Sequence, residues 1–99
     1  MQLISVSYKA LRKEKRLSLH QAGKILNMDP SLVSRIENNL RQPTREQLMN
    51  IAKLYELDPD ALLVDWLSEK IARELKEEAL AGRVLQAVVR KLESGNHQL

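Results

Sequence analysis

Apolar residues along this chain recur every three or four positions, which is the spacing of one face of an α-helix. No stretch alternates apolar and polar residues in the way a half-buried strand requires. The periodic segments are separated by residues that start or end helices, and the connections are only a few residues long, as in compact helical domains. The pattern therefore predicts an all-α fold.

The first two predicted helices have identifiable ends. The first ends near the charged run 12–16. Ser18 and Gln21 form a capping box, which begins a second helix, and Asn27 ends it because Asn tolerates the left-handed conformation of a tight turn. The apolar residues of the first helix are Ile4, Tyr8 and Leu11. Those of the second are Ala22, Ile25 and Leu26.

The third and fourth helices have equally clear starts. Asp29 can cap free backbone N–H groups and Pro30 suits a first turn, so a helix is expected from about residue 30 to 38. Thr44 and Gln47 repeat the capping box ahead of the fourth helix. The apolar face of that helix consists of Leu48, Ile51, Ala52 and Tyr55.

The periodicity changes after Asp58 and Pro59, which start a fifth helix that we expect to be short. One set of apolar residues then steps by four through Leu67, Ile71, Leu75 and Ala79. A second set does so on a shifted phase through Leu80, Val84, Val88 and Leu92. The shift predicts two helical segments with a bend near 77–82, where Gly82 weakens the helix.

These boundaries predict three regions. Residues 1–64 form a small helical domain, residues 65–93 form a helical extension of one or two helices, and residues 94–99 form a flexible tail. The domain alone is large enough to hold one hydrophobic core, so the extension is not needed for folding.

Charge is distributed unevenly along the chain. Residues 1–53 contain ten Lys and Arg against four acids, a net +6, whereas residues 54–99 contain six against nine, a net −3. A basic first half indicates a polyanionic partner, although an ordinary solvated surface explains the charge equally well on its own.

Several classes of function lack the residues they need. The chain has no Cys, and its two imidazoles, His20 and His97, have no metal-ligand spacing, so we expect no metal site, no cofactor and no enzymatic activity. Three aromatic residues provide no stacking surface for single-stranded RNA. No apolar run is long enough to cross a membrane, so we expect a cytoplasmic protein.

Apolar residues at Leu26, Met28 and Val33 lie where a helix-turn-helix packs its second helix across its first, with Gly23 at the close approach. Residues 4–64 resemble the phage Cro and repressor (XRE) helix-turn-helix family, of bacterial or phage origin. The resemblance is carried by "LR" at 11–12, "LVSRIENN" at 32–39 and "QPTREQLMNIAKLYEL" at 42–57. It implies five helices, of which the second and third contact double-stranded DNA.

The resemblance also implies roles for individual residues. Arg12 and Glu37 correspond to a partly buried structural ion pair. Base edges would be contacted by Ser31, Ser34 and Arg35, and phosphates by Asn38, Arg41 and Arg45. His20, on the exposed side of the second helix, is a further candidate for phosphate contact.

Four residues depart from the family pattern. Leu19 replaces a Gln that contacts DNA in many members, and Gly23 replaces Ala. Asn27 and Asn39 stand at usual glycine positions, which Asn tolerates best after Gly.

The extension has two interpretations: it enlarges the core of the monomer, or it forms a dimer. We favour a homodimer, because DNA-binding proteins of this type usually work in symmetric pairs. The residues expected at the dimer interface are Trp66, Leu67, Ile71, Leu75, Leu80, Val84 and Val88.

The sequence thus predicts a dimeric regulator of transcription, a repressor or autoregulator bound to a palindromic operator. A controller of a restriction-modification system has the same design. The alternative is an antitoxin-like protein whose extension binds and neutralises a protein partner.

Overall fold

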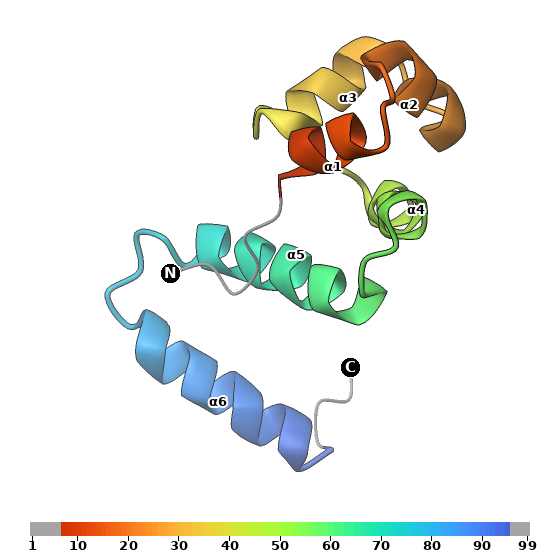
Figure 1. Ribbon diagram of the computed structural model, residues 1–99. Helices are drawn as coiled ribbons and strands as arrows, with labels where there is room; N and C mark the ends of the chain where they lie inside the picture. Colours follow the sequence, from red (N-terminus) through yellow and green to blue (C-terminus); the bar gives the residue numbers. More distant parts are fainter. Residues whose placement is uncertain (1–6, 96–99) are drawn as a thin grey trace. The chain divides into compact units, whose positions relative to one another are not determined.

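The computed structural model describes residues 7–95, over which the chain forms six α-helices and no strand (Figure 1). The expected all-α class is therefore confirmed. The helices are α1 (Tyr8–Glu14), α2 (Leu19–Leu26), α3 (Pro30–Glu37), α4 (Arg45–Tyr55), α5 (Pro59–Glu74) and α6 (Ala81–Glu93). Ile4, assigned above to the first helix, lies outside the described residues, as do residues 96–99 of the predicted tail.

Both predicted capping boxes are present. Gln21 donates its backbone N–H to Ser18 Oγ at 3.0 Å, and Ser18 N–H donates to Gln21 Oε1 at 2.8 Å. Thr44 and Gln47 form the same reciprocal pair at 3.1 and 2.9 Å. Each box satisfies two backbone donors that a helix start would otherwise leave free, so α2 and α4 begin at fixed residues.

Four residues other than glycine adopt the left-handed backbone conformation at helix ends or turns. Asn27 (φ 56°) and Asn39 (φ 60°) adopt it, as expected from their glycine-like positions. Arg16 (φ 59°) and Glu56 (φ 55°) adopt it too, after α1 and α4. The sequence does not mark these two turns, because neither residue type favours a positive φ.

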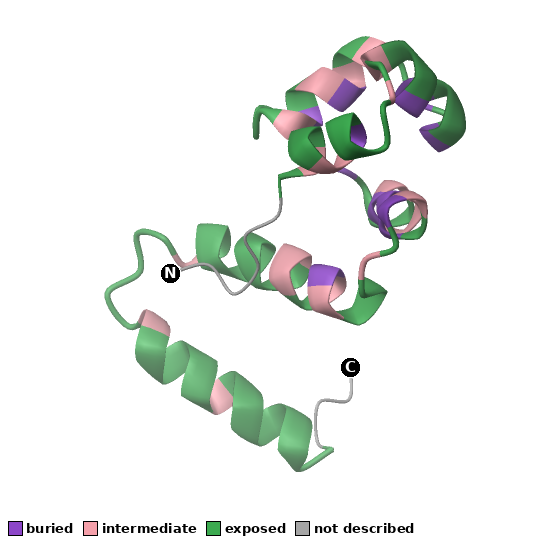
Figure 2. Ribbon diagram, viewed as in Figure 1, coloured by how far each residue is buried: buried purple, intermediate pink, exposed green. Residues whose placement is uncertain are grey.

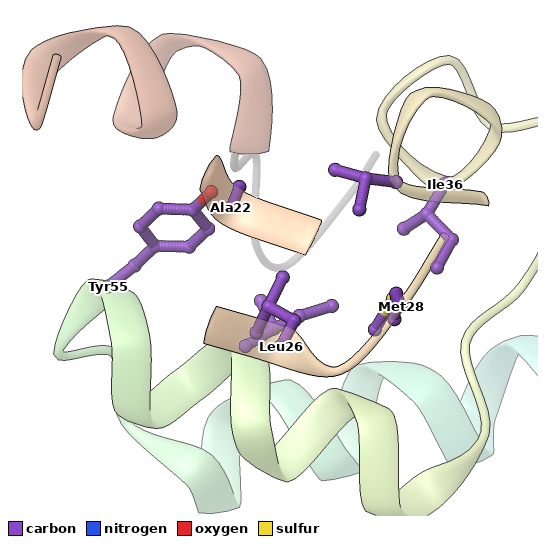
Figure 3. Close-up of a cluster of buried hydrophobic side chains, with 7 residues drawn as sticks. Ala22, Leu26, Met28, Ile36 and Tyr55 are labelled. Carbon is purple, nitrogen blue, oxygen red and sulfur yellow. The ribbon is translucent and has the colours of Figure 1, made fainter. Parts of the chain in front are cut away.

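The chain divides between Trp66 and Leu67 into two units. Buried side chains of the described residues belong to the first unit (Figure 2). Its larger cluster consists of Ala22, Leu26, Met28, Val33, Ile36, Ile51 and Tyr55. Figure 3 shows Tyr55 of α4 pointing toward Ala22 of α2. Tyr8 stacks on Tyr55 with ring centroids 6.5 Å apart, and burial raises the pKa of both phenols.

A second cluster attaches the start of α5 to α4. Leu48, Ala52 and Leu62 are buried in it, and Trp66 packs against it. The Trp66 indole N–H donates to the Pro43 carbonyl at 2.8 Å, which joins α5 to the segment ahead of α4. The first turns of α5 therefore belong to the first unit.

One ion pair joins α1 to α3. Arg12 Nε lies 2.7 Å from Glu37 Oε2, and Nη2 donates to Oε1 at 3.1 Å, so the pair is bidentate. Arg12 Nη1 donates to the Leu17 carbonyl at 3.0 Å. Both side chains are less than 10% exposed. The hydrogen bond that Arg12 donates to Glu37 is the main cause of the raised pKa of Arg12.

Two expectations about the helices are wrong. The fifth helix is not short: α5 runs for 16 residues, because no Gly or Pro interrupts 60–74. Ile25 does not face the core, and its side chain is 57% exposed. The side of α2 that faces inward carries Ala22, Gly23 and Leu26, which are buried. The backbone at Met28 packs against Gly23.

The second unit contains α6 and the end of α5. The chain turns between residues 75 and 80, which confirms the bend, and Gly82 lies within α6 rather than in the turn. None of the residues of α6 is buried. No helix among residues 7–95 is both long and apolar enough to span a membrane.

We expect Gly23→Ala to destabilise the first unit by about 1–3 kcal/mol, the usual cost of overpacking a tight site. A Cβ there would lie 2.5 Å from the Met28 carbonyl oxygen, so the backbone of the turn would have to move. Chemical denaturation followed by circular dichroism measures the loss. Gly82→Ala is the matched control, since a Cβ there meets nothing within 4 Å and should only favour α6. Equal stability for Gly23→Ala and wild type would contradict the close approach.

We expect Arg12→Ala to lower the free energy of unfolding by about 3–5 kcal/mol, because it leaves the Glu37 carboxylate buried without its partner. The double variant Arg12→Met/Glu37→Leu removes both charges and should be more stable than Arg12→Ala. Urea unfolding of the three proteins tests this order, and a double variant as unstable as the single one would show that the charges themselves are required.

Candidate nucleic-acid interface

The contact between α2 and α3 determines which side of α3 is free. Val33 and Ile36 of α3 are buried against the core, so the opposite side of this eight-residue helix faces outward. Ser31 and Arg35 are exposed, and Ser34 is half-buried. The three residues predicted to contact bases therefore lie on a surface that a groove could cover.

Asp29 organises the first turn of α3. Its Oδ1 accepts from the backbone N–H of Ser31 and from the Ser31 hydroxyl, each at 3.1 Å. Pro30 follows it at the first helical position, as expected from the sequence. The cap thus fixes both the backbone and the first outward side chain of the helix.

The end of α3 is closed by Asn38. Its side-chain Nδ2 donates to the Ser34 carbonyl at 2.8 Å and lies 3.4 Å from Ser34 Oγ. Asn38 was predicted to contact phosphate, and its amide is engaged with α3 in this structure. Ser34 and Asn38 are therefore held together, one turn apart.

The four basic residues of the predicted interface come from α2, α3, α4 and the segment between α3 and α4. Arg35 lies on its outer side, Arg41 in the segment between α3 and α4, Arg45 at the first turn of α4, and His20 at the first turn of α2. All four are exposed, and none of their side chains forms a hydrogen bond or ion pair within the described range 7–95. Their donors remain available to a ligand.

Trp66 helps to hold the segment between α3 and α4. Its bond to Pro43 lies directly ahead of Thr44, the N-cap of α4. The sequence assigned Trp66 to a dimer interface, and the structure places it in the first unit. The signal that could have indicated this position is the indole N–H, which needs an acceptor when the ring is half-buried.

The other residues predicted for dimerisation lie in the second unit. Leu67, Ile71, Leu80, Val84 and Val88 are exposed and Leu75 is half-buried. On α6 an apolar stripe follows the helical period through Ala81, Val84, Leu85, Val88 and Leu92. Arg83, Gln86 and Arg90 lie away from this stripe.

Comparison with known proteins agrees with this geometry. Residues 9–62 match a family model described as helix-turn-helix, which covers most of α1 and all of α2, α3 and α4. No curated protein and no solved structure matches the chain.

Proposed function

Since the chain belongs to the Cro- and repressor-like (XRE) helix-turn-helix family, whose members are DNA-binding transcriptional regulators rather than enzymes, we propose that it binds a specific operator through α3. The observation that carries the proposal is the outer side of α3, where Ser31 and Arg35 are exposed and Arg35 is unpaired within residues 7–95. A guanidinium on such a helix suits guanine O6 and N7.

Phosphate contacts would hold the helix in place. Arg41 lies in the segment that follows α3, Arg45 at the first turn of α4 and His20 at the first turn of α2, and these three side chains would contact phosphates beside the groove that α3 enters. Contacts of this kind fix register and supply affinity but do not select bases.

The second unit supports a homodimer on a palindromic operator. None of the residues of α6 is buried, so its apolar stripe is exposed to water, which is unfavourable. Pairing with a second α6 would cover this stripe. Two copies of α3 would then enter major grooves about one helical turn, roughly 34 Å, apart. Binding there would block transcription in the cytoplasm, as a repressor or autoregulator does, including one that controls a restriction-modification system.

The antitoxin-like alternative uses the same apolar stripe for a different protein. It predicts a monomer in the absence of that protein, whereas the repressor proposal predicts a dimer. The oligomeric state in solution therefore separates the two.

Selection of bound duplexes from a random pool tests the operator proposal. We expect a palindromic motif and a steep decrease of affinity with salt.

Arg35→Ala should weaken binding to the preferred duplex by about 1–3 kcal/mol and relax one base position. Arg41→Ala should weaken all duplexes alike and lower the salt slope by about one. Arg83→Ala on α6 makes the same charge change outside the first unit, and its binding should stay near wild type. An unchanged motif for Arg35→Ala would contradict its assignment.

We expect Val88→Asp to weaken dimerisation at least about tenfold, because the new carboxylate would be buried within the apolar stripe of α6. Sedimentation over a concentration series measures the dissociation constant. Gln86→Asp adds the same charge on the opposite side of α6 and should leave the dimer intact. A dimer that survives Val88→Asp would exclude this stripe as its interface.

A further inference from the structure

We infer that α3 presents hydrogen-bond acceptors at its first turn and donors one turn later, so that each half-site carries a cytosine met by Asp29 and, within about three base pairs, a guanine met by Arg35. This inference rests on the proposed function, in which α3 enters the major groove. It adds Asp29 to the residues that determine sequence specificity, and it assigns a direction to the contacts along the helix.

The first turn offers acceptors because of the way Asp29 caps it. A carboxylate only accepts hydrogen bonds, and Asp29 Oδ1 already accepts from both Ser31 N–H and Ser31 Oγ–H at 3.1 Å. The Ser31 hydroxyl therefore donates its only proton to Asp29, and it can only accept a hydrogen bond from a ligand. Asp29 Oδ2 has no partner among residues 7–95, and the Asp29 side chain is exposed.

The next turn offers donors. The Arg35 guanidinium has hydrogen-bond donors and no acceptor, and none of these donors has a partner within the described part of the chain. Ser34 Oγ lies 3.4 Å from the Asn38 amide nitrogen as an acceptor, which leaves the hydroxyl proton of Ser34 to donate. Asp29 and Arg35 are six residues apart, which is about 9 Å along a helix and less than three base-pair steps of about 3.4 Å.

The acceptor end selects among bases by what they expose in the major groove. Guanine and thymine present acceptors there, which oppose a carboxylate. Adenine presents an amino group beside the N7 acceptor, whereas cytosine presents an amino group alone. Cytosine is therefore the base that suits Asp29 Oδ2 and the acceptor lone pairs of Ser31. Phosphates repel the same carboxylate, which favours a position over a base edge rather than over the backbone.

Duplex selection with the full-length wild-type chain and with Asp29→Asn tests the inference. Asn caps a helix about as well as Asp, so the variant should keep its fold, and thermal unfolding checks this. We expect the wild-type motif to contain one cytosine per half-site that other bases replace only with a roughly 5- to 150-fold loss of affinity. In Asp29→Asn that preference should disappear, because the amide can donate as well as accept, while the guanine position persists.

Asp58→Asn provides the matched control. Asp58 also precedes a proline and accepts from the backbone N–H two residues on, at 3.0 Å to Asp60, but it caps α5 rather than α3. The substitution makes the same charge change, so a uniform gain in affinity shared by both variants reflects charge alone.

The outcomes separate the two proposals. If the wild-type chain enriches no motif, the proposed operator binding fails. If it enriches a motif that Asp29→Asn leaves unchanged, or changes only by a uniform gain in affinity, operator binding stands and the role of Asp29 in base selection is overturned.

Discussion

The position of α3 depends on the ion pair between Arg12 and Glu37. The Arg12 guanidinium donates from Nε and Nη2 to the Glu37 carboxylate and from Nη1 to the Leu17 carbonyl. It therefore joins α1, the turn between α1 and α2, and α3. In a unit this small the apolar core gives cohesion but little direction, because hydrophobic contact is not directional. A bidentate pair has defined geometry, and it therefore orients the helix that carries the candidate base contacts.

The features predicted correctly from the sequence are those with local causes. The capping boxes at Ser18 and Thr44 depend on residues three positions apart, and Asn27 supports a positive φ by its own chemistry. Long-range packing decided the rest. Ile25 fits the apolar period of α2, yet the turn at Met28 approaches the Gly23 side and leaves Ile25 in solvent. Trp66 fits the period of the extension, yet its N–H finds Pro43, 23 residues away.

The sequence predicted which residues form the candidate site, but it could not predict which of their hydrogen-bonding atoms are free. The family resemblance indicated Ser31, Ser34 and Arg35, and the structure places Ser31 and Arg35 on the outer side of α3. It could not indicate which of their atoms were already engaged, because that depends on Asp29 and Asn38. The two units also differ in kind. Buried side chains of the described residues belong to the first unit, whereas none of the residues of α6 is buried, so we propose that association acts through the second unit and DNA contact through the first.

The bond from Trp66 to Pro43 also determines what this protein shows spectroscopically. Trp66 is the single tryptophan of the chain, so its near-ultraviolet emission arises from one indole at one place. That indole is half-buried against α4 and hydrogen-bonded just ahead of the first turn of α4, two residues after Arg41. The fluorescence of the unlabelled protein therefore reports on the segment between α3 and α4, and it does so without an introduced probe.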